Sequence, residues 1–130
     1  MKYLLDVNAL LALGFDHHQF HERVAVWVGA ERQPTLATCS ITELGFVRIL
    51  CQTPLYQLTL VEARSLLLRL KNSNVFPFTF LLDDHDISHL PAWVKSSKQT
   101  TDGHLAQLAS AQGAILATLD ERIPGAFLIP

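Results

Sequence analysis

Short apolar runs alternate with longer helical segments along almost the whole of this 130-residue chain. Strands alternating with helices predict a parallel sheet, because the connection between parallel strands is usually a helix. The strand-like runs lie at 1–6, 34–40, 75–83, 114–120 and 126–129. We therefore expect an α/β fold of three layers, helix, sheet and helix, with a mostly parallel central sheet.

Helical segments fill the spaces between those runs. We expect helices at 9–13, 20–28, 40–51, 58–72, 86–94 and 103–113, and a loop at 95–103. Asn8 is a candidate cap for the first helix, and Gly29 is expected to end the second. Pro77 fits best at the start of a strand or on an edge strand, since it cannot donate a backbone hydrogen bond.

Composition limits the size and class of the protein. With 49% of its residues apolar and 17% charged, the chain can bury a core, and we expect a single domain over residues 1–130. The net charge of −2 gives no basic bias, which argues against broad, nonspecific nucleic-acid binding through phosphates. The remaining apolar surface would suit a dimer or a partner chain.

Cysteine usage and hydropathy bear on the cellular location. Cys39 and Cys51 form neither a disulfide framework nor a zinc pattern, so we expect two reduced, buried thiols. We expect no signal peptide before the first strand, and no apolar run approaches the length needed to span a bilayer. These features predict a cytoplasmic protein that is not attached to a membrane.

Four acidic residues stand where an apolar run breaks or a helix begins. Asp6 and Asp120 end strands, whereas Glu43 and Asp102 open helices. In a parallel sheet these positions belong to the same edge, beyond the carboxyl ends of the strands, where ligands bind. Converging carboxylates raise one another's pKa unless a cation intervenes, and oxygen ligands suit Mg²⁺ or Mn²⁺.

Each acid also has a purely structural explanation. Asp6 could cap the first helix in competition with Asn8, and Glu43 could complete a capping box with Ser40. Asp102 would be favoured by the helix dipole, and Asp120 could be a turn residue. None of these roles predicts that all four acids share one edge of the sheet.

A carboxylate-held cation at that edge would favour hydrolysis of a phosphodiester by an activated water. Two other interpretations stay open. In a phosphatase resembling haloacid dehalogenases, Asp6 would be a phosphorylated nucleophile, although such enzymes place an Asp where Asn8 stands. In a noncatalytic binding module, the acids would serve as caps and the apolar surface would dock a partner.

Four blocks of sequence resemble the acidic blocks of PIN-domain ribonucleases, especially VapC-type toxins. They are LLDVNALLAL at 4–13, SITELGFVRIL at 40–50, TTDGHLAQLA at 100–109 and LATLDERI at 116–123. Their order and spacing match over essentially the whole chain. The resemblance implies a PIN-like three-layer fold, Mg²⁺ or Mn²⁺ dependence, endonucleolytic cleavage of RNA, homodimerisation and neutralisation by a cognate antitoxin.

The same resemblance implies residue roles. Asp6, Glu43 and Asp102 would be the main metal-site and catalytic acids, and Asp120 the fourth. Asn8 and Thr118 would be supporting polar residues; many PIN domains have Ser or Thr where this chain has Asn8.

Other polar and aromatic residues carry weaker signals. His17, His18 and His21 form a local cluster, in which His17 and His21 would share a helix face if the helix began early enough. A solvated helix start or a substrate-facing edge is favoured over a zinc site, because no third ligand stands at a recognisable spacing. We expect surface positions for His85, His89 and His104, with RNA phosphate as a lesser possibility for His104. Candidate phosphate contacts are Arg48, Lys95, Lys98 and Arg122, although surface solubility is the favoured role for each one alone. Trp27 and Trp93 could stack on bases, but core or dimer packing is favoured.

Overall fold

The computed structural model describes residues 1–30 and 34–130. Its centre is a five-stranded sheet in the order β3-β2-β1-β4-β5, and every neighbouring pair is parallel. The strands are β1 (Lys2–Leu5), β2 (Thr35–Thr38), β3 (Phe78–Phe80), β4 (Ala114–Thr118) and β5 (Phe127–Leu128). The expected α/β class is confirmed, and all the strand-like runs form strands.

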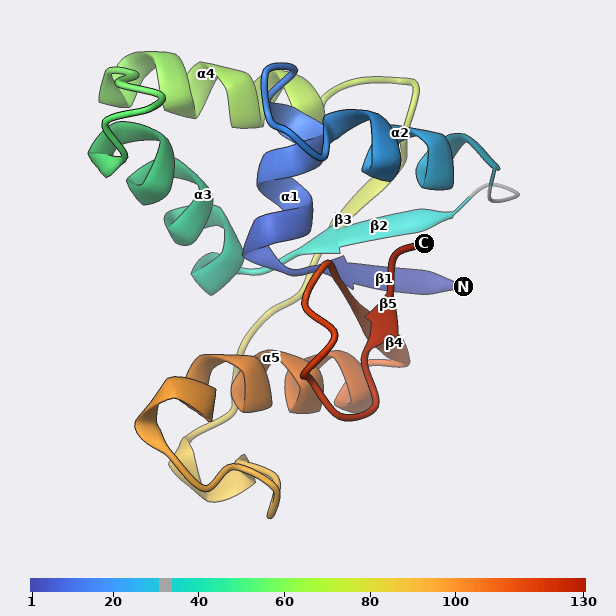
Figure 1. The fold of residues 1–130 in the computed structure, drawn as a ribbon. Coiled ribbons are helices and arrows are strands. Elements are labelled where there is room, and N and C mark those ends of the chain that lie inside the picture. Colours follow the sequence, from blue (N-terminus) through green and yellow to red (C-terminus); the bar gives the residue numbers. More distant parts are fainter. Residues whose placement is uncertain (31–33) are drawn as a thin grey trace.

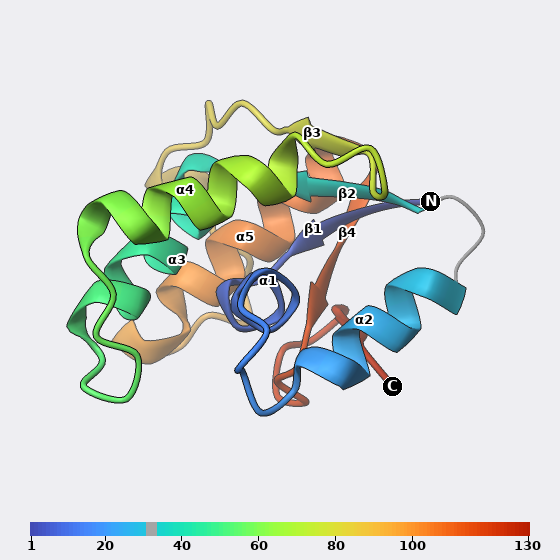
Figure 2. The same ribbon diagram turned by 90° about the horizontal axis from the view of Figure 1, so that it is seen from above.

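Helices cover both faces of this sheet. They are α1 (Val7–Gly14), α2 (His21–Ala30), α3 (Ser40–Gln52), α4 (Leu60–Lys71) and α5 (Thr100–Ala111), with single 3₁₀ turns at Ile87–His89 and Ser97–Gln99. Figure 1 shows α1 to α4 on one face and α5 on the other. Seen from above, α3 and α4 run side by side next to α1 (Figure 2). None of the helices in the described ranges is long and apolar enough to cross a bilayer.

Two apolar clusters hold the three layers together. Tyr3 and Leu5 point to the face that α1 to α4 cover, whereas Leu4 points to the face that α5 covers. This alternation follows from the period of two in a strand. Burying one such leucine side chain contributes about 1.5 to 3 kcal/mol, so strands with apolar residues on both faces must be covered on both.

Several boundaries differ from those expected from the sequence. Asn8 is not a cap, because α1 already begins at Val7 and Asp6 is its N-cap. Gly29 lies inside α2 and does not end it. Within the expected loop at 95–103, a 3₁₀ turn leads directly into α5, which begins at Thr100. The expected helix at 86–94 is reduced to the single turn Ile87–His89, because Pro91 interrupts it.

The strand order creates a switch point between β1 and β4. From β1 the chain proceeds outward through β2 to β3, whereas β4 pairs on the opposite side of β1 and is followed outward by β5. Loops beyond the carboxyl ends of two such strands diverge, which leaves room for a ligand. Asp6 and Asp120 follow these two strands.

Phe46 tests how far the core depends on the contact between α1 and α3. Its side chain is fully buried, and a Cβ added to Gly14 of α1 would lie only 2.8 Å from its ring. Phe46→Ala should lower the free energy of unfolding by about 3 to 5 kcal/mol, through lost burial and a cavity. Urea denaturation measures this. Leu44→Ala on the same helix, at a side chain 65% exposed, is the control, and an equal loss there would contradict the assignment.

Candidate metal centre

Asp6 is fixed by both of its carboxylate oxygens. Oδ1 accepts a hydrogen bond from the backbone N–H of Val7 at 2.8 Å, and Oδ2 accepts one from the Thr118 hydroxyl at 2.8 Å. The residue is only 7% exposed. Burial raises the pKa of Asp6, the two hydrogen bonds oppose that rise, and the charge of Asp120 adds to it.

Thr118 is the organising residue of the switch point. While donating to Asp6, its buried hydroxyl accepts from the Asn8 side-chain amide at 3.3 Å and from the backbone N–H of Asp120 at 3.0 Å. Asn8 in turn accepts from the backbone N–H of Leu119 at 3.1 Å. Asn8 and Thr118 therefore lie beside Asp6, and together they tie the start of α1 to the end of β4.

Asp120 is paired with a cation from its own turn. The Arg122 guanidinium donates to Oδ1 at 3.0 Å and to Oδ2 at 3.1 Å, and the Arg122 backbone N–H also donates to Oδ1 at 2.9 Å. These hydrogen bonds hold the pKa of Asp120 below its ordinary value. The Arg122 side chain is 85% exposed, so water and salt weaken this pair.

Asp102 lies in the first turn of α5, as the sequence predicts. Burial raises its pKa, and the charges of Asp6 and Asp120 raise it further, against a smaller opposing effect of Arg122. Asp6, Asp102 and Asp120 thus lie within electrostatic range of one another at a single edge. In the described part of the chain, no hydrogen bond or ion pair engages the Asp102 carboxylate, which leaves it open to a ligand.

Glu43 is oriented by a different set of partners. Its Oε2 accepts a hydrogen bond from the Thr38 hydroxyl at 2.5 Å and forms an ion pair with Lys71 Nζ at 2.5 Å. The alternative role of Glu43, a capping box with Ser40, is wrong, because Cys39 is the N-cap of α3 and the Thr42 hydroxyl accepts from its backbone N–H. Thr42, at the third position of α3, has the capping role that the alternative gave to Glu43, and the Glu43 side chain instead contacts Lys71.

Lys71 and Thr38 were not among the residues singled out from the sequence. A signal for Thr38 exists, since β2 and β4 both end in Leu-Ala-Thr and both threonines are fully buried. Each hydroxyl donates to one of the four acids. Lys71 gives no such signal, because a lysine in the last turn of a helix is common and is favoured by the helix dipole alone.

The donor set fits a divalent cation of the magnesium type. It consists of carboxylate oxygens, and burial together with mutual repulsion raises the pKa of Asp6 and Asp102, which indicates negative charge that a cation would neutralise. Within residues 1–30 and 34–130, no three acidic, histidine or cysteine side chains stand as a ready-made metal cluster. Two of the four acids, Glu43 and Asp120, already have cationic partners.

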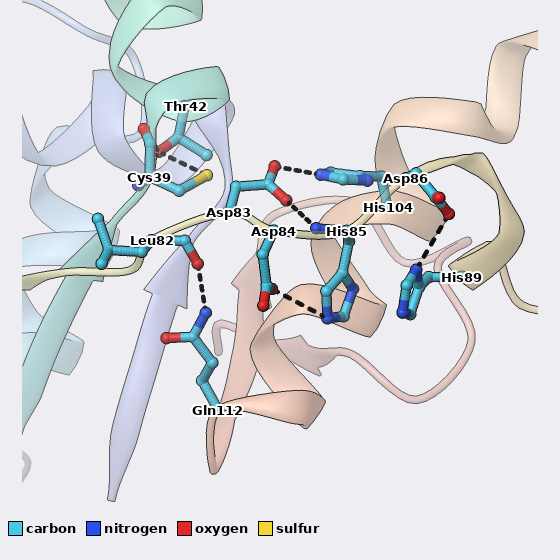
Figure 3. A network of polar contacts seen from close by, with 10 residues as sticks. All are labelled: Cys39, Thr42, Leu82, Asp83, Asp84, His85, Asp86, His89, His104 and Gln112. Atoms are coloured by element: carbon cyan, nitrogen blue, oxygen red, sulfur yellow. Dashed lines mark hydrogen bonds and ion pairs between the residues drawn. The ribbon is translucent and has the colours of Figure 1, made fainter.

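A network of histidines and aspartates lies on the α5 side of the molecule (Figure 3). His104 of α5 contacts Asp83 at 2.5 Å, and the His85 and His89 rings stack with centroids 4.2 Å apart. The surface position expected for His85 is wrong, since its side chain is only 9% exposed. The segment after β3 crosses to the α5 side of the sheet, and the sequence alone does not show this path.

The three N-terminal histidines do not form a zinc site. His21 contacts the backbone carbonyl of Ala12 at 2.7 Å, and His18 accepts a hydrogen bond from the backbone N–H of Phe20 at 3.0 Å. Because α2 begins only at His21, His17 lies outside the helix and does not share a face with it.

The candidate RNA-contacting residues divide into two groups. Arg48, Lys95 and Lys98 are exposed, whereas Arg122 is engaged by Asp120 as described above.

Trp27 is buried against Tyr3 and Phe127, with ring centroids 4.9 and 5.4 Å away. Trp93 packs against the cluster on the α5 side. Core packing of both tryptophans, the favoured expectation, is confirmed.

Comparison with known proteins adds independent information. The family model described as PIN domain matches residues 3–126. Ribonuclease VapC38 of Mycobacterium tuberculosis is 38% identical over 121 residues, covering 90% of this chain and 84% of the relative. Ribonuclease VapC44 of the same species is 36% identical over 129 residues, covering 95% of this chain and 89% of the relative.

Solved structures share the fold at low sequence identity. The crystal structure of Mycobacterium tuberculosis VapC20, described as a Sarcin-Ricin loop cleaving toxin, has a TM-score of 0.64 at 11% identity, covering 93% of this chain and 92% of that one. VapBC2 from Rickettsia felis, bound to a DNA fragment from its promoter, has a TM-score of 0.53 at 16% identity, covering 98% and 97%. The three-layer PIN-like architecture expected from the sequence is therefore confirmed.

Thr118→Val tests the organising hydroxyl. The change keeps the shape but removes the donor to Asp6 and leaves the backbone N–H of Asp120 without its acceptor. We expect the free energy of unfolding to fall by about 1 to 3 kcal/mol, because a buried polar group loses its partner. Urea denaturation measures the change. Thr118→Ser, which keeps the hydroxyl, should restore most of it; equal losses in both variants would indicate a packing effect instead.

Asp6→Asn tests the electrostatic cost of the buried carboxylate. The pKa of Asp6 is raised in the folded state, so the protonated carboxyl stabilises the fold more than the carboxylate does. The free energy of unfolding therefore falls as the pH rises above the ordinary pKa of 3.8. In chelator, Asp6→Asn should therefore resist urea better than the wild type at pH 7, and the advantage should shrink towards pH 4. An advantage that grows on acidification would contradict the sign of this shift.

Proposed function

The chain belongs to the PIN-domain family, and we propose that it is a Mg²⁺-dependent endoribonuclease and the toxin of a toxin–antitoxin pair. The observation that carries the proposal is that Asp6, Asp102 and Asp120, at the switch point of a parallel sheet, interact electrostatically, and that the pKa of Asp6 and Asp102 is raised. The relatives named as ribonucleases support RNA as the substrate. Mn²⁺ should substitute for Mg²⁺, since both accept oxygen ligands.

The residues of the site divide the work between them. Asp6, Asp102, Asp120 and Glu43 would hold the ion, which supplies charge stabilisation at the phosphate and acidifies water when it is bound. Thr118 and Asn8 keep Asp6 in one orientation. Asp102, which has no hydrogen-bond donor among the described residues, is the acid best placed to accept a proton from an attacking water.

The antitoxin in this proposal is a protein partner, and one surface of the chain suits it. Leu44, Leu60, Leu68 and Phe80 are exposed apolar residues that line a groove of about 430 Å³ between α3 and α4. Glu43 also lines this groove. A partner that buries these side chains would gain hydrophobic contact and lie directly beside one of the four acids. The same excess of apolar surface supports a homodimer.

Phosphatase chemistry with Asp6 as a nucleophile is less favourable. Both oxygens of Asp6 accept hydrogen bonds, and the residue is nearly inaccessible to a substrate. Asn8, at the position where such enzymes place a second Asp, is occupied by contacts to Thr118 and Leu119. A noncatalytic binding module would explain the groove, but it would not explain why the Asp102 carboxylate has no hydrogen bond or ion pair among the described residues.

Asp102→Asn tests the enzymatic proposal. The substitution removes the charge at a partly exposed position and should reduce cleavage of single-stranded RNA by on the order of a hundredfold or more, as expected when a group that stabilises the transition state is lost. Excess chelator should abolish wild-type cleavage. Cleavage is measured with purified protein and an end-labelled RNA.

Asp84→Asn is the matched control, because the Asp84 side chain is 92% exposed and pairs with His85, at 3.9 Å, and not with a residue of the candidate metal centre. It should cleave like the wild type. Full activity of Asp102→Asn, or of the wild type in chelator, would refute the nuclease. Growth arrest on expression that Asp102→Asn relieves would assign the protein as a toxin, and arrest that persists in this variant would exclude cleavage as its cause.

A further inference from the structure

Among residues 1–30 and 34–130, Lys71 makes the closest cationic contact to any of the four acids. Its Nζ lies 2.5 Å from Glu43 Oε2, and the Thr38 hydroxyl donates to the same oxygen at 2.5 Å. The side chains of Lys71 and Glu43 are each 23% exposed, so the pair is much less screened than the pair between Asp120 and Arg122. Lys71 Nζ also lies 5.3 Å from the centroid of the Phe80 ring, which helps to hold the ammonium group in place.

The dipoles of α3 and α4 stabilise the ion pair between Glu43 and Lys71. Glu43 lies in the first turn of α3, where the helix dipole favours a negative charge. Lys71 is the last residue of α4, where the dipole favours a positive charge. Both dipoles and the Phe80 ring therefore stabilise the pair, and Glu43 stays beside Thr38.

This arrangement has a cost for metal binding. Glu43 Oε2 already accepts a hydrogen bond from the Thr38 hydroxyl and contacts an ammonium group, so this oxygen has little remaining capacity for a metal ion. The positive charge of Lys71, 2.5 Å from that oxygen, also repels a metal cation. Asp102, by contrast, has no partner among the described residues. The four acids are thus unequal: Asp6, Asp102 and Asp120 interact electrostatically with one another, and Glu43 is held by a lysine.

We propose that Lys71 is a positioning residue that acts as an internal cation, holding Glu43 beside Thr38 so that Glu43 joins the metal centre only when a divalent ion displaces the ammonium group. The inference rests on the proposed function, because it concerns the metal of that site. Lys71 sets the concentration of ion at which the fourth carboxylate is recruited. A merely structural ion pair between α3 and α4 would not compete with the ion.

Titration of the intact 130-residue chain with Mn²⁺ by calorimetry tests the competition. Lys71→Met removes the competing ammonium and should tighten Mn²⁺ binding by on the order of tenfold, within the usual range of coupling between two sites. Lys71→Arg, which keeps a cation, should bind Mn²⁺ like the wild type. Combining Lys71→Met with Glu43→Gln should remove the gain, because Glu43 is the group through which Lys71 acts.

Arg69→Met is the matched control for net charge. Arg69 lies in the same last turn of α4, and its hydrogen bond among the described residues is to the Ser65 carbonyl, at 3.4 Å, so its loss removes one positive charge without removing a contact to Glu43. Mn²⁺ affinity should stay unchanged in this variant. An equal gain in Arg69→Met would show a general charge effect, and unchanged or weaker affinity in Lys71→Met would overturn the proposal.

A measurement without metal separates this inference from the nuclease proposal. In chelator, Lys71→Met should lower the melting temperature by leaving Glu43 unpaired, and adding Glu43→Gln should restore part of the loss. Additive effects would show that the pair is not formed and would overturn the inference alone. If the pair is coupled but no variant binds Mn²⁺, the metal centre and the competition fail together, while the ion pair stands.

Discussion

The parallel pairing of β1 with β4 determines where the chemistry of this protein is located. Leu5 lies opposite Ala117 in that ladder, and the backbone N–H of Asp6 continues it with a hydrogen bond to the Ala117 carbonyl at 2.9 Å. This register sets Asp6 next to Thr118. A shift by one residue would turn the Thr118 hydroxyl to the other face of the sheet and leave the Asp6 carboxylate buried without its donor. The site therefore depends on the register of the two central strands.

The chain uses one device twice to orient an acid. β2 and β4 end in the same three residues, and the buried threonine that closes each strand donates to a carboxylate beyond it: Thr38 to Glu43 and Thr118 to Asp6. A β-branched residue suits this role, because its methyl group packs in the sheet while its hydroxyl has few available rotamers. The two carboxylates then differ in what else contacts them. Asp6 has no cationic partner among the described residues, whereas Glu43 has Lys71.

The sequence predicts the features that depend on periodicity and on sheet edges. Each apolar run contains one of the five strands. The acids are predicted at one edge of the sheet, because the carboxyl ends of parallel strands lie at the same edge. It could not predict contacts made by segments distant in the chain. Lys71 meets Glu43 across two helices, and His104 meets Asp83 only because the segment after β3 crosses to α5. The sequence also left the N-cap of α1 open between Asp6 and Asn8, since both residue types are good caps, and the structure shows Asp6 in that role.

Compensation of charge explains why the four acids are so unequal. Burying a carboxylate without a partner is unfavourable, and the fold avoids that cost at Asp120 with Arg122 and at Glu43 with Lys71. It does not avoid the cost at Asp6 and Asp102, where burial and mutual repulsion raise both pKa values. Groups arranged in this way destabilise the folded protein unless a ligand stabilises them, which is the usual signature of a functional site. Because the Arg122 side chain is 85% exposed and the Lys71 side chain only 23%, water and salt screen the pair at Asp120 more than the pair at Glu43.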